Sequence, residues 1–214
     1  MNADEIARFL RTHPQFFDEH PDLLESIYVP HPHGGRTIAL TERQILGLRE
    51  KTKLLEAKLG ELVRLGAENE AIGEKVHRLS LALVGTRDFV SCVQAVYFHL
   101  REDFAVPHVA LRLWDKALPE GAPEGAAVEA VSRATIEAMG APQCGPAAGS
   151  PFLGWFGNAQ EHVRSLALVP LGQTRSFGLL ALGAEDPQRF YAEMGTLFLR
   201  RIGDLVAGAL AARL

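Results

Sequence analysis

Hydrophobic positions across residues 41–85 recur in alternating steps of three and four, within a segment that contains no proline. This spacing is typical of a coiled coil, whose apolar positions follow one side of a long helix. Thr52 fills one gap in the repeat, and two successive steps of three between Leu59 and Leu65 form a stammer. The predicted dimer interface consists of Ile45, Leu48, Leu55, Leu59, Leu62, Leu65, Asn69, Ile72, Val76, Leu79 and Leu83.

We therefore expect a homodimer joined by this helix. A polar residue such as Asn69 at one interface position can fix the register of a coiled coil at a cost in stability. The pattern leaves open whether the two helices run parallel or antiparallel. It also fits an alternative in which the helix packs against other helices of its own chain.

Residues 1–40 are predicted to form short helices and a turn. Ile6, Phe9 and Leu10 share one face of a helix over residues 3–13, and the turn covers residues 29–35. The long helix then begins at Thr41, whose hydroxyl and the Gln44 side chain fit a capping box. This division gives three regions, at residues 1–40, 41–86 and 87–214.

The third region has the pattern of an α+β domain. Two almost wholly apolar strands are joined by a short turn, so we expect a central antiparallel sheet that is covered on both faces. Residues 126–139 read as a helix, although part of them could form an edge strand. The other expected elements are a helix at 88–104 capped by Asp88, strands at 108–114, 165–171 and 177–182, an irregular segment at 140–157 and a helix from about 187 to 214.

The last helix carries a second stripe of mostly small residues at four-residue spacing. Small side chains allow either another helix or the sheet to approach closely, and the sequence does not decide between these. The stripe consists of Gly195, Leu199, Gly203, Ala207 and Ala211.

Several short motifs resemble a bacterial family known as domain of unknown function 484. The resemblance covers essentially the whole chain, and Ala184 stands where a serine is expected. It implies a coiled-coil N-terminal half and a GAF-like C-terminal half, and no catalytic residue or ligand. The motifs are Phe9-Leu10, His13 to Phe17, Pro30-His31, Arg43-Gln44, Cys144-Gly145 and Gly178 to Phe190.

Composition limits the classes of function. A net charge of −4 and a pI near 6.1 disfavour nucleic-acid binding. No apolar run reaches the roughly 18 residues of a membrane span, and no secretory signal opens the chain. Cys92 and Cys144 have no disulfide-framework spacing. We expect a cytoplasmic protein with reduced thiols and no membrane contact.

The sequence shows no catalytic or metal-binding constellation. His31 and His33 flank a proline without further ligands at metal-site spacing, and we predict no metal or cofactor. An apolar pocket is the positive candidate, because ligand sites are usually apolar clefts. The same side chains could instead fill the core. The candidate ligand-binding residues are Leu113, Cys144, Phe152, Trp155, Phe156 and Leu168.

These observations favour a non-enzymatic, homodimeric sensor or interaction module that binds a small molecule or a protein partner. A purely structural dimeric scaffold without a ligand is the alternative. An enzyme is disfavoured because the sequence offers no paired nucleophile and base.

Overall fold

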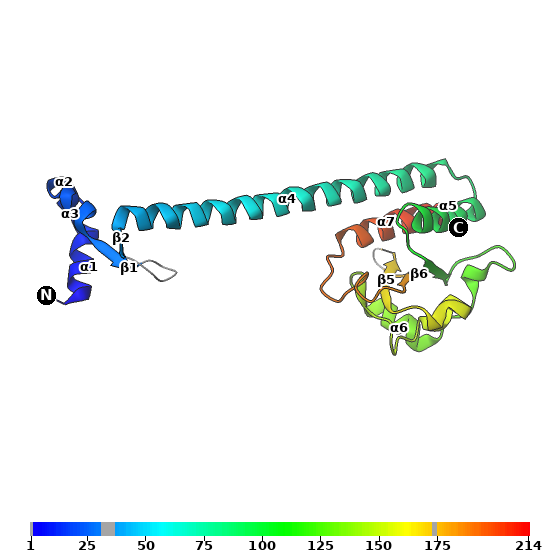
Figure 1. The fold of residues 1–214 in the computed structure, drawn as a ribbon. Helices are drawn as coiled ribbons and strands as arrows, with labels where there is room; N and C mark the ends of the chain where they lie inside the picture. The colour runs from blue at the N-terminus through cyan, green and yellow to red at the C-terminus, as the bar shows by residue number, and fades with distance from the viewer. Residues whose placement is uncertain (1, 31–36, 173–174) are drawn as a thin grey trace. The chain divides into compact units, whose positions relative to one another are not determined.

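A computed structural model describes residues 2–30, 37–172 and 175–214 of the chain (Figure 1). The chain forms two compact units, residues 1–67 and 68–214. The boundary lies inside the long helix α4 (Leu40–Gly85), so α4 contributes its first part to one unit and its second part to the other. The sequence analysis instead placed its boundaries at the two ends of this helix, after residues 40 and 86.

The N-terminal unit contains three short helices and a two-stranded hairpin. Asn2 caps the first helix through a reciprocal capping box with Glu5. Aromatic rings join the helices, since Phe9 stacks on His13 at 4.5 Å and meets Phe16 edge-on at 6.1 Å. The elements are α1 (Ala3–Thr12), α2 (Phe16–Glu19), α3 (Pro21–Ser26), β1 (Tyr28–Pro30) and β2 (Thr37–Ala39).

The hairpin corrects one expectation, because Val29 and Pro30 belong to β1 rather than to a turn. A proline is tolerated there, since a two-stranded sheet consists only of edge strands and a missing donor can face away from the partner. His31 and His33 lie outside the described residues. The side chain of Thr41 also lies outside them, and α4 begins one residue before the predicted cap.

The C-terminal unit is built on a four-stranded antiparallel sheet with the strand order β3-β6-β5-β4. The predicted hairpin of two apolar strands is confirmed, with Ser165 opposite Ala184 and Leu171 opposite Gly178. An α+β fold with a central antiparallel sheet is therefore confirmed. The strands are β3 (His108–Leu113), β4 (Gln143–Pro146), β5 (Ser165–Leu171) and β6 (Gly178–Ala184).

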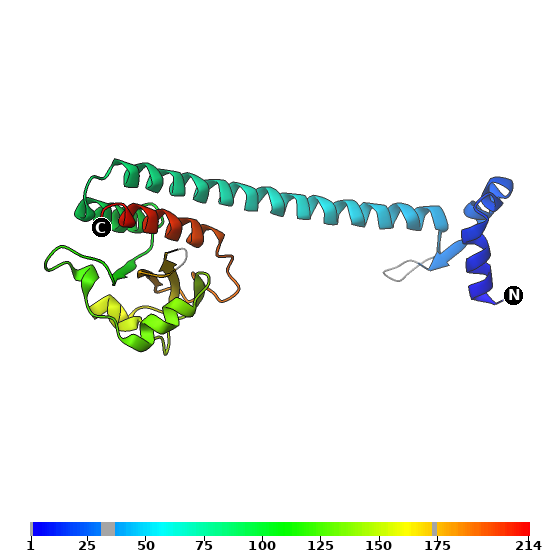
Figure 2. The same ribbon diagram turned by 180° about the vertical axis from the view of Figure 1, so that it is seen from behind.

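Helices and 3-10 turns cover both faces of this sheet (Figures 1 and 2). One face packs against α5, α7 and the C-terminal part of α4 in the main core. The other face packs against α6 and η2 in a smaller cluster centred on Trp114 and Phe152. The covering elements are α5 (Phe89–Glu102), η1 (Pro123–Gly125), α6 (Ala130–Ala138), η2 (Leu153–Glu161) and α7 (Leu197–Ala211).

Close packing of α7 on β5 settles the role of Gly203. A Cβ atom built on Gly203 would lie 2.6 Å from Val169 Cγ1, so the glycine lets the helix approach the sheet. Ala207 is also buried, whereas Gly195 and Ala211 at the ends of the stripe are exposed. The central part of the small-residue stripe therefore serves sheet packing.

Two side-chain networks hold α4 in the C-terminal unit. Arg213 donates to the carbonyl oxygens of Leu83 and Thr86, each at 2.8 Å, and so satisfies acceptors at the end of α4. Asp103, directly after α5, accepts hydrogen bonds from His99 and Arg78. The hydrogen bond from His99 is the main cause of the lowered pKa of Asp103, and Arg78 lowers it further.

Candidate functional site

The six predicted ligand-binding residues do not line one pocket. Leu113 is only 2% exposed and belongs to the main core, on the face of the sheet that α4, α5 and α7 cover. The half-buried Cys144 also packs against this core. Phe152 is 2% exposed in the cluster on the opposite face. Trp155 and Leu168 pack against that same cluster, whereas Phe156 packs in a third group around Val163.

Strand alternation explains this separation. Successive side chains of a strand point to opposite faces, and residues paired across a sheet share a face. Leu113 pairs with Gly178, and Gly178 pairs on its other side with Leu171. Leu113 and Leu171 therefore share a face, and both belong to the main core. Leu168 is three residues before Leu171, so it lies on the other face. The strand register therefore places these residues on both faces of the sheet rather than around one pocket, and the burial of Leu113 and Phe152 favours the core-filling alternative for these two.

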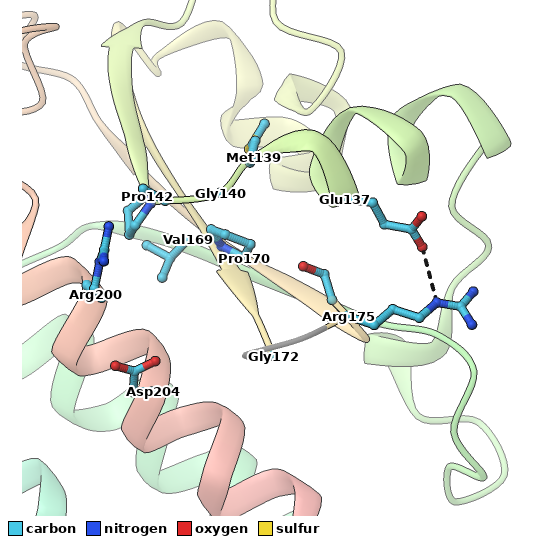
Figure 3. A pocket seen from close by; sticks show the side chains of 12 residues that line it. Glu137, Met139, Gly140, Pro142, Val169, Pro170, Gly172, Arg175, Arg200 and Asp204 are labelled. Carbon is cyan, nitrogen blue, oxygen red and sulfur yellow. Dashed lines mark ion pairs between the residues drawn. The ribbon is translucent and has the colours of Figure 1, made fainter.

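A cavity of about 660 Å³ lies instead between the end of α6, β5 and α7 (Figure 3). Its volume is within the roughly 300–1,000 Å³ of typical small-molecule sites. Two arginines contribute to it from different elements. The described lining residues are Glu137, Met139, Gly140, Ala141, Pro142, Val169, Pro170, Gly172, Arg175, Ser176, Arg200 and Asp204.

The two arginines of this cavity differ in their partners. Arg175 Nε lies 3.6 Å from Glu137 Oε1, and Arg175 Nη2 lies 3.3 Å from Asp115 Oδ2. Arg200 extends from α7 toward Pro142 and forms no ion pair with a described residue (Figure 3). A guanidinium without an ion-pair partner suits an anionic or carbonyl-bearing group. Asp204, four residues later on α7, places a carboxylate in the same lining. The described lining holds one side-chain hydroxyl, that of Ser176, and no histidine that could activate it.

A second, apolar cavity of about 160 Å³ lies between Ile72 of α4, Phe104, Phe190 and Phe198. It is smaller than the range given above for ligand sites, so it is the weaker candidate of the two. Its position shows that the C-terminal part of α4 is in contact with the segments that lead into α7.

The two cysteines do not provide a reactive thiol. Burial raises the pKa of the Cys92 thiol and of the Cys144 thiol, so both are protonated at neutral pH. Within residues 2–30, 37–172 and 175–214 no group of three or more histidine, cysteine or acidic side chains is placed to hold a metal ion. In those same ranges, every helix is too short or too polar to cross a bilayer.

The predicted dimer interface divides into two parts. Leu79 and Leu83 are 0% and 3% exposed in the core of their own chain, and Ile72 and Val76 are half-buried. They are therefore not available as a free surface, which is the alternative of intrachain packing realised for this part of α4. Six apolar positions before Asn69, which we call the α4 stripe, are between 41% and 66% exposed. The α4 stripe consists of Ile45, Leu48, Leu55, Leu59, Leu62 and Leu65.

Comparison with known proteins gives relatives without an assigned activity. The chain is 26% identical over 204 residues to "Uncharacterized protein YigA" of Salmonella typhimurium, covering 92% of this chain and 86% of that protein. The YigA proteins of Shigella flexneri and Escherichia coli K12 match with the same identity and coverage.

Among solved structures, the GAF domain of A. Aeolicus nlh2 matches at a TM-score of 0.48 and 15% identity, covering 68% of this chain and 99% of that chain. The free methionine-R-sulfoxide reductase of Neisseria meningitidis matches at 0.47 and 16%, with 67% and 92% coverage. A sensor histidine kinase GAF domain from Pseudomonas syringae matches at 0.44 and 16%, with 70% and 92% coverage. At these scores we draw no functional conclusion from the similarity.

The family is shown by a model that spans nearly the whole chain and carries the description "Protein of unknown function, DUF484". It matches residues 1–213, which include the short N-terminal helices, α4 and the sheet domain. The chain therefore belongs to the DUF484 family.

Proposed function

We propose that this chain is a non-enzymatic homodimeric module in which the α4 stripe pairs with the same stripe of a second copy. The observation that carries the proposal is the exposure of the α4 stripe. Leu55, Leu59 and Leu62 are 66%, 63% and 66% exposed in one chain, although their spacing is that of a coiled-coil interface. Exposed leucines at this spacing need a partner surface.

The energetics support pairing. Full burial of a leucine stabilises by about 1.5–3 kcal/mol, so each leucine that is two-thirds exposed can still contribute about 1–2 kcal/mol. Six positions on each of two chains then give a gross gain of about 12–24 kcal/mol, which reaches or exceeds the estimated 4–15 kcal/mol cost of association. Gly60 and Gly66 each weaken the isolated helix by roughly 1 kcal/mol, which increases its need for a partner.

Two adjacent leucines provide a matched test. Leu55 belongs to the α4 stripe, whereas Leu54 is 57% exposed on a different side of the helix. We expect Leu55→Lys to weaken the dimer at least tenfold, because a coiled-coil interface would have to bury the ammonium group. Leu54→Lys should leave the mass unchanged. Light scattering after gel filtration at micromolar concentration measures both, and equal masses for the two variants would contradict the proposal.

A sensing role is a second candidate, supported by the cavity of Figure 3. Arg200 lies on α7, which packs in the same core as Leu79 and Leu83 of α4. A ligand that binds Arg200 would therefore act on a helix in contact with the one proposed to join the dimer. Native mass spectrometry of freshly purified protein should show a bound small molecule that is lost in Arg200→Ala. Without such a molecule, a dimeric scaffold is the better description.

A further inference from the structure

A groove between α5 and the turn η1 contains a buried carboxyl group that forms no ion pair with a described residue. Two adjoining cavities, of about 510 and 340 Å³, share Gln94, Tyr97, Pro123 and Glu124 as lining residues. The shared residues make the two cavities one continuous groove along the outer side of α5. It lies at the β3 edge of the sheet, away from the cavity lined by Arg200.

Glu124 is the chemically unusual residue of this groove. It is only 4% exposed, and buried carboxylates are costly unless a cation or several donors compensate them. Within the described part of the chain, no lysine or arginine forms an ion pair with it. Its one identified partner is the Tyr97 hydroxyl, which donates to the carboxylate while accepting from the backbone N–H of Leu111.

The same arrangement affects the pKa of Tyr97. The pKa of the Tyr97 hydroxyl is raised, first by burial and then by the negative charge of Glu124. A phenol that remains protonated can donate only one hydrogen bond, so Tyr97 supplies one hydrogen bond to the Glu124 carboxylate and no positive charge.

The rest of the groove is acidic and aromatic. Glu102 and Glu120 also line it, and Arg101 is the one cation in its described lining. Arg101 lies over the Tyr97 ring at 5.5 Å from the ring centroid. Phe98 is 61% exposed beside it. Three carboxylates and one guanidinium leave an excess of negative charge next to a large exposed aromatic ring.

We propose that this groove binds a small molecule with a guanidinium group, which pairs with Glu124 while its carbon chain rests on Phe98. A planar guanidinium matches a carboxylate through two parallel hydrogen bonds and favours aromatic faces. The combined cavity is of the size that suits a small molecule. The inference does not depend on the proposed dimer, because every residue of the groove lies between 89 and 124 of one chain.

Butylguanidinium and the neutral, nearly isosteric butylurea test the proposal when titrated into the full chain and followed by amide NMR shifts. Butylguanidinium should shift the amides of Gln94, Tyr97 and Phe98 with saturation, and butylurea should not. In Glu124→Gln, which retains an acceptor for Tyr97, the affinity should fall at least tenfold. Equal binding of the two compounds, or no saturable shift at the groove, would overturn the proposal.

Two further variants keep the test valid if Glu124→Gln fails to fold. The double variant Glu102→Gln/Glu120→Gln changes only exposed groove acids and should weaken butylguanidinium binding about two- to fivefold. Glu129→Gln changes an exposed acid outside the groove and should leave the affinity unchanged. An equal loss in both would show a non-specific charge effect and contradict the proposal. Binding of an arginine-containing peptide without butylguanidinium binding would contradict a small-molecule site.

Discussion

The two parts of α4 should respond differently to the same substitution. Leu79 is 0% exposed in the core of its own chain, whereas Leu62 of the α4 stripe is 66% exposed. Replacing a fully buried leucine by alanine costs about 2–5 kcal/mol through lost burial and the cavity that remains. The same change at Leu62 removes few contacts within the chain, so its direct cost should be below about 0.5 kcal/mol.

Urea unfolding followed by tryptophan fluorescence measures both effects, because Trp114 and Trp155 lie in the C-terminal unit. With a slope of about 2 kcal/mol per molar urea, Leu79→Ala should lower the midpoint by about 1–2.5 M. This loss should not depend on protein concentration, since the lost contacts are within one chain. Leu62→Ala should lower the midpoint only at concentrations where the unmodified chain is a dimer, because association stabilises by mass action.

Two results would refute this reasoning. If Leu62→Ala lowers the midpoint as much as Leu79→Ala at every protein concentration, Leu62 is packed within its own chain. If Leu79→Ala costs less than about 1 kcal/mol, the end of α4 is not part of the core.

Three further predictions concern the C-terminal unit. Gly203→Ala should lower the thermal midpoint because the added Cβ would meet Val169 of β5. A Cβ added at Gly208 would meet no atom within 4 Å, so Gly208→Ala should raise stability by up to about 1 kcal/mol. Equal shifts of the two variants would contradict the close contact between α7 and the sheet. The lowered pKa of Asp103 contributes stability that is present at neutral pH and is lost as the pH falls through that pKa. In acid unfolding titrations, Asp103→Asn should therefore lose less stability below about pH 4 than the unmodified chain does. Cys144 should react with a disulfide reagent at pH 7 more slowly than free cysteine, and Cys92 only after unfolding; rapid labelling of either would refute the raised pKa values.

Long and periodic elements could be predicted from the sequence. The absence of proline and the regular leucines indicated α4 to within one residue of its ends, and Asp88 marked the start of α5. The two apolar strands also indicated a covered sheet. These elements depend on local patterns that the sequence carries directly.

Short edge elements depend on a partner and were missed. β4 contains Gly145 and Pro146, which are poor strand formers, and its pairing comes from β5. α7 begins at Leu197, about ten residues later than predicted, after a segment that contains Pro187 and Gly195. The pairing with β5 decides the conformation of β4, whereas the late start of α7 agrees with the local helix breakers Pro187 and Gly195.

The site was harder to predict than the fold. The faces of Leu113 and Leu168 follow from the strand register, which the sequence does not specify. The roles of Arg200 and Glu124 depend on neighbours that are distant in sequence. A charged residue in a sequence is usually exposed, and nothing in the sequence around these two indicates that they line a cavity. Glu124 in particular stands in a Pro- and Gly-rich segment that predicts only a loop.

Sedimentation equilibrium of the unmodified chain at micromolar concentration tests the central claim most directly. The claim is that the α4 stripe joins two copies, and it predicts twice the 23.3 kDa mass of one chain, with dissociation on dilution. A mass of one chain over the whole concentration range would contradict it.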